Sequence, residues 1–174
     1  MTRRQEFDQF YRSVFANLVG QLVLVTGDRH EAEDIAQEAL CRAAAHWSRV
    51  RDYDIPEAWV RRVAMNLAAT RLRQARSRLR ALAGLRREAS VPAVSEDAVA
   101  LTEAMRGLPV RHRQALVLRY LLGMSTEEAA GTLGVPAGTV KSWLARGRKG
   151  LAAQLSEHQP EDQPEDQEVP STHA

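Results

Sequence analysis

The sequence predicts an all-α protein with two small helical domains, a flexible linker between them and a disordered acidic tail. Apolar residues recur at the helical period of 3.6 residues along most of the chain, and no segment alternates apolar and polar residues as a half-buried strand would. Periodicity stops over about residues 81–96, where glycine, proline and serine gather, and stops again near residue 155. We therefore expect domains at 1–80 and 97–155, a linker at 81–96 and a tail at 156–174.

Three helices are expected in the first domain, over about residues 4–25, 29–47 and from 57 to beyond 78. Gly27 and Asp28 end the first helix, residues 48–56 are predicted to form a loop, and Pro56 is suited to open the third helix. The third helix is expected to bury Trp59, Val60, Val63, Leu67 and Leu72. Its opposite face carries a basic stripe made of Arg62, Asn66, Arg73 and Arg80.

Two further helices are expected at the start of the second domain. One covers about residues 96–107, and the other runs from Pro109 to Gly123. The apolar period of the second helix predicts that it buries Ala115, Leu116, Leu118, Leu121 and Leu122.

Residues 125–151 have the pattern of a helix-turn-helix. Ser125 and Glu128 form a capping box that opens the first helix. Gly134 lies where the chain must turn sharply with a positive φ, and Pro136 suits the first position of the next helix. The inward positions are Ala129, Ala130 and Leu133 on the first helix, and Val140, Leu144, Gly147 and Leu151 on the second.

The outward face of that second helix is small and polar at its start and basic further on. Such a helix can lie in the DNA major groove, with its N-terminal residues at the bases and its basic residues at the phosphates. A plain solvated hairpin with a basic end is the alternative, but it leaves the turn residues unexplained. The outward residues are Ala137, Gly138, Thr139, Lys141, Ser142, Arg146, Arg148 and Lys149.

Charge is distributed unevenly along the chain. The formal net charge is only +2, yet none of the 24 basic residues and six of the 22 acidic ones lie after Leu155, which leaves residues 1–155 at +8 and the tail at −6. A basic body indicates a polyanionic partner. The tail contains almost no apolar residue, so it is expected to stay disordered, and shielding of the basic faces is one hypothesis for its role.

Several classes of function are not supported. A single cysteine, Cys41, excludes an internal disulfide and a cysteine-rich metal site, and the five histidines are scattered. Glycine-rich phosphate loops and catalytic constellations are missing, so we expect no cofactor, no metal and no enzymatic activity. No membrane-spanning run or signal peptide is recognisable, which predicts an intracellular, cytoplasmic protein.

Three segments of the chain resemble, in the same order, segments of the extracytoplasmic-function sigma factors of bacterial RNA polymerase. These are the minimal members of the sigma-70 family (group IV). The suggested sub-branch is the actinobacterial SigE-like one. The three segments are EAEDIAQEAL at 31–40, AWVRRVAMNLAATRLR at 58–73 and LPVRHRQALVLRYLLGMSTEEAAGTLGVPAGTVKSWLARGRKGL at 108–151. The resemblance covers about residues 6–155. It implies that residues 1–80 are a sigma domain 2 with a three-helix core and that residues 97–155 are a sigma domain 4.

For domain 2, the resemblance implies docking on core polymerase and capture of −10 promoter DNA. Asp34, Gln37 and Glu38 share one helix face and would bind basic groups on the clamp of the large β′ subunit. The alternative is an ordinary solvated acidic face stabilised by a Glu38–Arg42 pair, which would have the same sequence pattern. The loop before the third helix and the face with Asn66 would hold a flipped −10 base. Trp47 and Tyr53 are candidates for stacking, and Trp59 fits the core better. The −10 residues implied are Tyr53, Arg61, Arg62, Asn66 and Arg73.

For domain 4, the resemblance implies −35 contacts and a second polymerase contact with the flap of the β subunit. Trp143 departs from the family pattern, since a basic or polar residue is usual there, and no base-reading role is assigned to it. An anti-sigma factor is a further partner that the family suggests, whereas membrane insertion is not expected. The −35 residues implied are Arg113, Arg119, Thr139, Lys141, Ser142, Arg146 and Arg148.

Two other functions remain open at the level of the sequence. A stand-alone dimeric helix-turn-helix regulator would use residues 1–80 for dimerisation or ligand binding and would recognise a palindrome. A protein-binding adaptor would use the basic faces for acidic partners. Neither alternative accounts for both the basic stripe on the third helix and the helix-turn-helix.

Overall fold

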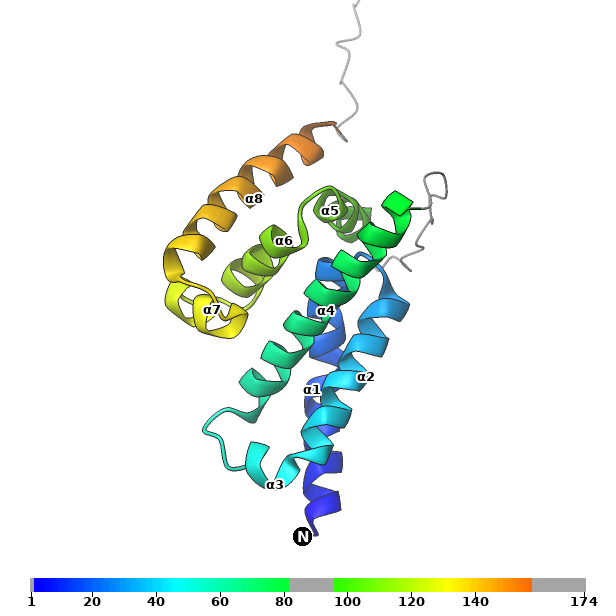
Figure 1. The fold of residues 1–174 in the computed structure, drawn as a ribbon, viewed down its shortest axis with the longest axis vertical. Helices are drawn as coiled ribbons and strands as arrows, with labels where there is room; N and C mark the ends of the chain where they lie inside the picture. Colours follow the sequence, from blue (N-terminus) through cyan, green and yellow to red (C-terminus); the bar gives the residue numbers. More distant parts are fainter. Residues whose placement is uncertain (1, 82–95, 158–174) are drawn as a thin grey trace, which may run out of the picture.

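A computed structural model describes residues 2–81 and 96–157; the predicted linker and nearly all of the predicted tail lie outside these ranges. Every regular element within the described ranges is helical (Figure 1). The helices α1, α2, α3 and α4 form an N-terminal bundle, and α5, α6, η1, α7 and α8 form a C-terminal bundle. Their bounds are α1 Arg3–Thr26, α2 Arg29–Ala45, α3 Trp47–Val50, α4 Pro56–Ala81, α5 Glu96–Arg106, α6 Val110–Leu116, η1 Val117–Leu121, α7 Thr126–Leu133 and α8 Ala137–Glu157.

Local sequence signals set the ends of α1 and α2. Thr2 and Gln5 form a capping box at the start of α1, and Gly27 ends that helix with φ at 75°. Asp28 then caps α2 by accepting a hydrogen bond from the Glu31 backbone N–H. These three helix boundaries were predicted within a few residues because capping depends on neighbours in the sequence.

The predicted loop over residues 48–56 is partly wrong, because Trp47–Val50 forms the short helix α3. This turn of helix places the Trp47 ring against α1, with its centroid 5.2 Å from Phe7 and 4.8 Å from Phe10. Trp47 is only 6% exposed. It therefore belongs to the core and cannot stack on a nucleic-acid base in this conformation.

Helix α4 is buried along two of its sides rather than one. The helix contacts α1 and α2 as well as α6 and α7, its fully buried residues include Val60, Ala64, Met65 and Ala68, and the Met65 carbonyl accepts a hydrogen bond from Gln114 of α6. The apolar stripe predicted for this helix is therefore only partly correct. Among the residues predicted to be buried, Val60 is fully buried, and Trp59, Val63 and Leu67 are partly buried against the core. Alanines occupy the contact because small side chains let neighbouring helices approach closely.

The C-terminal bundle contains a π-helical turn, η1, directly after α6. Such a turn shifts the register of the residues that follow it. Leu118 is fully buried, as predicted, but Leu121 is 55% exposed, which corrects the expectation that it lies in the core. Glycine permits the close contact between α8 and the segment that precedes α6, since a Cβ at Gly150 would lie 2.6 Å from Leu108 Cδ2.

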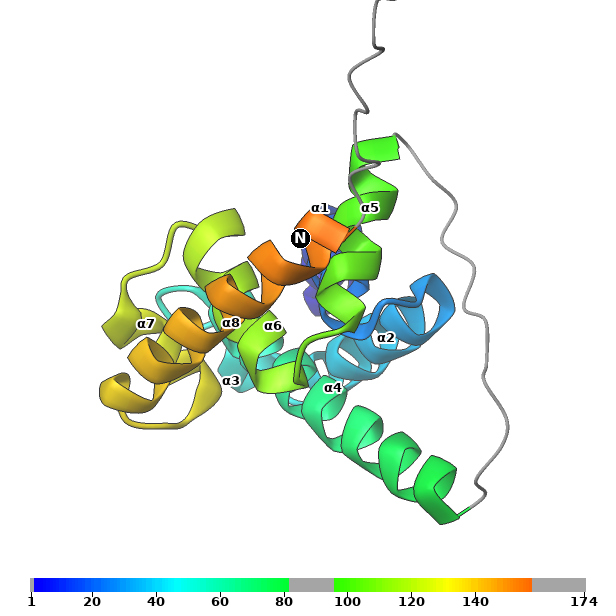
Figure 2. The same cartoon turned by 90° about the horizontal axis from the view of Figure 1, so that it is seen from above.

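The two bundles pack against each other along α4. Helices α1 and α2 contact one side of α4, and α6 and α7 contact the other (Figure 1). Seen from above, α5 lies over the end of α1, and α8 crosses α6 on the outside (Figure 2). Within residues 2–81 and 96–157, no helix is both long enough and apolar enough to cross a bilayer.

Candidate nucleic-acid interface

The helix-turn-helix forms as its local sequence requires. The Glu128 backbone N–H donates to Ser125 Oγ at 3.1 Å, and the Ser125 N–H donates to Glu128 Oε2 at 2.7 Å. The hydrogen bond that the Ser125 backbone N–H donates to the Glu128 carboxylate is the largest cause of the lowered pKa of Glu128, and the Ser125 side chain lowers it further. Gly134 turns the chain with φ at 67°, and α8 begins three residues later. The capping box and the left-handed turn are both confirmed.

Helix α8 presents its polar face away from the bundle. Val140, Leu144 and Gly147 are buried against α6 and α7, as the period predicted. All four basic residues of the predicted outward face, Lys141, Arg146, Arg148 and Lys149, are exposed, and Thr139 and Ser142 are half-buried. Arg148 Nη1 lies 3.5 Å from the hydroxyl of Tyr120.

The two arginines predicted from α6 and η1 occupy different environments. Arg119 is exposed, and its Nη1 donates to the Met124 carbonyl at 2.8 Å. Arg113 is only 3% exposed, so this conformation does not present it to a ligand. A DNA contact by Arg113 stays a prediction that requires movement of the surrounding elements.

Trp143 lies on α8 beside a cation from α6. The Arg111 guanidinium carbon is 5.9 Å from the Trp143 ring centroid, within the range of a cation–π contact. Trp143 thus packs on its own bundle, although sequence reasoning left its role open. Burial lowers the pKa of Arg111, and the positive charge of Arg73 on α4 lowers it further.

On α4, three of the predicted −10 residues share one exposed face. Arg62, Asn66 and Arg73 are all exposed and lie within one third of the helix circumference. Arg61 does not belong to this face: its Nε lies 3.3 Å from Gln21 Oε1 on α1, and burial lowers its pKa. Tyr53, in the segment before α4, is 37% exposed. The side chain of Arg80 lies outside the described part of the structure.

Asn66 borders a hollow between α2 and α4. The hollow has a volume of about 330 Å³ and is lined by Arg42, Val63, Asn66, Leu67 and Thr70. This volume is at the lower end of the range for small-molecule pockets. Its lining combines an amide, a hydroxyl and a guanidinium with two apolar walls, which suits a planar heterocycle with polar edges. Sequence reasoning missed Arg42 and Thr70, although Thr70 follows Asn66 at i, i+4 and was therefore recognisable as a neighbour.

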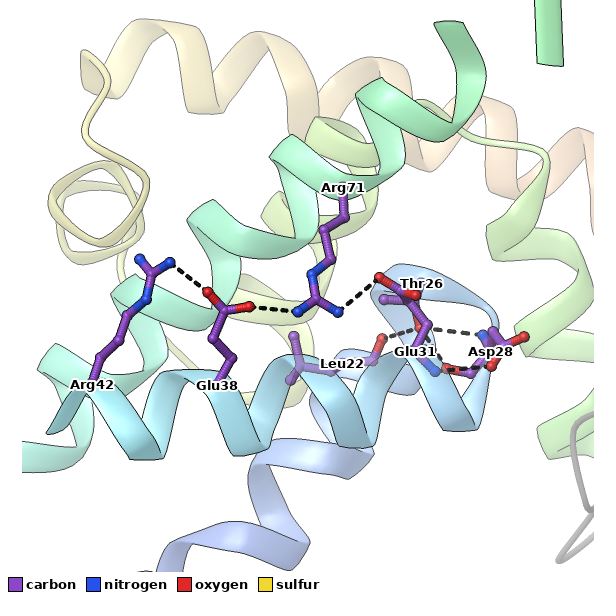
Figure 3. Close-up of polar contacts among 7 residues, drawn as sticks. All are labelled: Leu22, Thr26, Asp28, Glu31, Glu38, Arg42 and Arg71. Carbon is purple, nitrogen blue, oxygen red and sulfur yellow. Dashed lines mark hydrogen bonds and ion pairs between the residues drawn. The ribbon is translucent and has the colours of Figure 1, made fainter. Parts of the chain in front are cut away.

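The predicted docking face on α2 is only partly free. Asp34 and Gln37 are exposed, but Glu38 accepts hydrogen bonds from Arg42 Nη2 and from Arg71 Nη2, each at 2.5 Å (Figure 3). The hydrogen bond from Arg71 is the main cause of the lowered pKa of Glu38. The Glu38–Arg42 pair belonged to the alternative interpretation of this face as an ordinary solvated one, and the structure contains that pair.

Arg71 joins α4 to α2. Its side chain reaches from α4 to a point between Glu38 and Glu31, with Nη1 3.4 Å from Glu31 Oε1 (Figure 3). Asp34 and Glu38 lie at i, i+4 and repel each other mildly, and basic groups of a partner protein were predicted to relieve this repulsion. Within this chain, part of that relief comes from an arginine of the N-terminal bundle itself.

Comparisons with known proteins match both bundles to one family. The family model for sigma-70 region 2 matches residues 9–78, and that for sigma-70, region 4 matches residues 98–151. The ECF RNA polymerase sigma factor SigC of Mycobacterium tuberculosis is 32% identical over 149 residues, which cover 83% of this chain and 79% of that protein. The RNA polymerase sigma-E factor of Streptomyces avermitilis is 33% identical over 153 residues, covering 86% and 85% of the two chains.

A solved structure has a similar fold. The sigma factor RpoE from Bartonella quintana, crystallised with the anti-sigma factor NepR, superposes with a TM-score of 0.70 and 25% sequence identity. The match covers 89% of this chain and 99% of that chain. The likeness therefore includes helices from both bundles.

Proposed function

The chain belongs to the extracytoplasmic-function RNA polymerase sigma factors, and from that premise we propose that it is a dissociable initiation subunit acting in the cytoplasm. In this proposal it binds core RNA polymerase, directs it to −35 and −10 promoter elements and melts the −10 region. The observation that carries the proposal is the presence of sigma-70 regions 2 and 4 in one chain, each with a long helix whose exposed face is basic.

We assign −35 recognition to the outward face of α8. Lys141 and Arg146 are exposed there, and Thr139 and Ser142 lie near the helix start, where base edges are normally read. A bidentate contact from an arginine to guanine would contribute roughly 1–3 kcal/mol of discrimination. Arg119 and Arg148 would bind phosphates beside it, which would make binding depend on salt.

We assign −10 capture to the exposed face of α4 and the hollow beside it. Arg62 and Arg73 are placed to hold phosphates, while Asn66 can donate to and accept from the edge of an unstacked base. Removing a base from the stack costs a few kcal/mol, and contacts in the hollow would offset that cost. Tyr53, partly exposed ahead of α4, would supply a stacking surface.

Polymerase docking is assigned to Asp34 and Gln37, with Glu38 as the residue that joins the docking face to α4. The β′ clamp would supply basic groups for this face, and the β flap would contact the C-terminal bundle. An anti-sigma factor is a further proposed partner, as in the solved complex of the Bartonella relative. Catalysis of RNA synthesis would belong to the polymerase, and this chain would contribute binding and melting alone.

Gel filtration of the purified chain with core polymerase tests the docking step. We expect co-elution for the wild type and for Asp8→Lys, which reverses an exposed charge on α1. We expect loss of co-elution for the double variant Asp34→Lys, Gln37→Lys. Equal co-elution of all three proteins would contradict the assignment of the docking face, and failure of the wild type itself would contradict the proposed function.

A further inference from the structure

A hollow of about 700 Å³ lies where the N-terminal bundle meets the end of η1. It is lined by residues of α1, by the first turns of α4, and by Leu121 and Leu122. This volume falls within the range of small-molecule binding pockets. The lining residues lie outside the faces of α2, α4 and α8 assigned to polymerase and promoter DNA, so the proposed function leaves the hollow unexplained.

One wall of the hollow carries a guanidinium whose hydrogen bonds are incomplete. Arg61 is half-buried, and burial lowers its pKa because the charged form loses contact with water. Its Nε donates to Gln21 Oε1 on α1 at 3.3 Å. In the described part of the chain this is the only side-chain hydrogen bond of Arg61, and no carboxylate forms an ion pair with it. Its terminal amino groups can therefore bind an acceptor from outside the chain.

A carboxylate on the same wall limits the charge that the hollow can accept. Glu57 lies one turn before Arg61 on α4 and also lines the hollow. Its negative charge raises the pKa of Arg61, although no ion pair joins the two side chains within the described residues. One guanidinium can neutralise one negative charge, whereas a second charge on the ligand would stay unpaired beside Glu57. The wall therefore suits a monoanion better than a phosphate dianion.

Gly20 leaves free space in the hollow from the side of α1. It lies in the interior of a 24-residue helix, where glycine is less favourable than alanine. A Cβ at Gly20 would meet no atom within 4 Å, and the backbone there does not have a positive φ. Packing and backbone conformation in the described chain therefore give no reason for glycine at this position. A group that enters the hollow from outside would supply one.

Leucine side chains line the hollow on both bundles. Leu121 is 55% exposed, although it is a large apolar side chain. Leu24 on α1 and Leu122 after η1 are half-buried and also line the hollow. A hydrocarbon chain placed there would remove apolar surface from water on both the ligand and the protein, which is favourable.

We propose that the hollow binds a small amphipathic monocarboxylate, with the chemistry of a medium-chain fatty acid. The carboxylate accepts hydrogen bonds from the terminal amino groups of Arg61. The hydrocarbon chain passes over Gly20, and its other contacts are Leu24, Leu121 and Leu122. This site goes beyond the proposed function and does not depend on it, because neither DNA nor polymerase takes part in the binding.

Isothermal titration calorimetry of the full-length chain with sodium octanoate and sodium decanoate tests the site. We expect saturable binding of one molecule per chain, with decanoate roughly tenfold tighter because two more CH₂ groups are buried. 1-Octanol has the same hydrocarbon chain without the charge, so it should bind at least tenfold more weakly than octanoate. Lack of saturable binding for both carboxylates, or binding of 1-octanol as tight as that of octanoate, would overturn the proposal.

Charge variants test the carboxylate contact. Arg61→Met removes the guanidinium and keeps an unbranched side chain, so decanoate should bind at least tenfold more weakly. Arg12→Met, the same change at an exposed position of α1, is the control and should keep the wild-type affinity. Glu57→Gln removes the neighbouring negative charge and should tighten binding severalfold. An equal loss in both arginine variants, or weaker binding by Glu57→Gln, would contradict the proposed carboxylate contact.

A filled hollow tests the place of the hydrocarbon chain. Gly20→Leu puts a side chain into the open space, so decanoate should bind at least tenfold more weakly. Leucine favours a helix more than glycine does, so the folded state should persist, which circular dichroism checks. Gly131→Leu, the same change at an open position of α7, is the control and should bind decanoate normally. Full affinity of folded Gly20→Leu would overturn the proposal.

Discussion

The two helices assigned to DNA, α4 and α8, differ in whether they contact one bundle or both. Helix α8 packs on one side only, against its own bundle, and its inward and outward residues follow the sequence period. Helix α4 touches both bundles, so its buried side is wide and contains Met65, which the period of its larger apolar residues did not select. A helix that packs within one bundle can be interpreted from its own sequence, whereas a helix at the junction of two bundles cannot.

The largest expected effect concerns the hollow beside α4. Asn66→Ala removes the only amide that lines it, and we expect promoter-dependent transcription to fall about 10- to 100-fold, as for the loss of contacts to one captured base. Asn17→Ala, an exposed asparagine of α1, is the matched control and should keep full activity. Abortive-initiation assays on a premelted template should restore part of the loss. Full activity of Asn66→Ala would remove α4 from −10 capture.

A smaller effect is expected on α8. Arg146→Ala should weaken binding of a −35 duplex about tenfold, because an exposed cation on the recognition helix is lost. Fluorescence anisotropy at several salt concentrations measures both the affinity and the salt slope. A base contact predicts relaxed specificity at one position, while a phosphate contact predicts a smaller slope for all sequences. Arg12→Ala on α1 is the control, and equal weakening by both variants would contradict the assignment.

Two glycines of the helix-turn-helix should respond to alanine in opposite directions. Gly134 has φ at 67°, so Gly134→Ala strains the backbone and should lower the free energy of unfolding by about 1 kcal/mol or more. Gly131 lies inside α7 with open space at its Cβ position, so Gly131→Ala should raise that free energy by roughly 0.5–1 kcal/mol. Urea unfolding of both variants measures the difference. Changes of the same sign would contradict the geometry of the turn.

The smallest effect concerns the contact between α2 and α4. Hydrogen bonds from Arg71 and Arg42 lower the pKa of Glu38 below that of a free carboxyl group. A carboxylate with a lowered pKa stabilises the folded state above the ordinary carboxyl range, and this contribution disappears as the pH falls through the lowered pKa. Glu38→Gln should therefore be less stable than the wild type at pH 6, with the difference shrinking toward pH 3. A difference independent of pH would show that the ion pairs do not act this way.

Much of the fold was predictable because its signals are local. The capping boxes at Thr2 and Ser125, the left-handed glycines Gly27 and Gly134, and the inward face of α8 each depend on residues a few positions apart. They required no knowledge of tertiary contacts. The exposed basic residues of α4 and α8 were recognisable as a candidate site for the same reason, because the helical period of neighbouring residues shows which side chains point outward.

The parts that were not predicted depend on distant neighbours or on a register shift. Gln114 is a polar residue of a short helix, and its burial goes with a hydrogen bond to the Met65 carbonyl of the other bundle, which the sequence does not reveal. Arg71 was one of many arginines until the fold brought it to Glu38, 33 positions away in the sequence. Leu121 was misplaced because the π-helical turn η1 interrupts the helical period on which the prediction relied.

The central claim is that this chain directs RNA polymerase to promoters. In vitro transcription with the purified chain, bacterial core polymerase and a library of genomic promoter fragments tests it most directly. We predict transcripts that depend on the protein and share two upstream motifs at a fixed spacing. A complete absence of protein-dependent transcripts, together with no co-elution with core polymerase, would contradict the account and favour a stand-alone helix-turn-helix regulator.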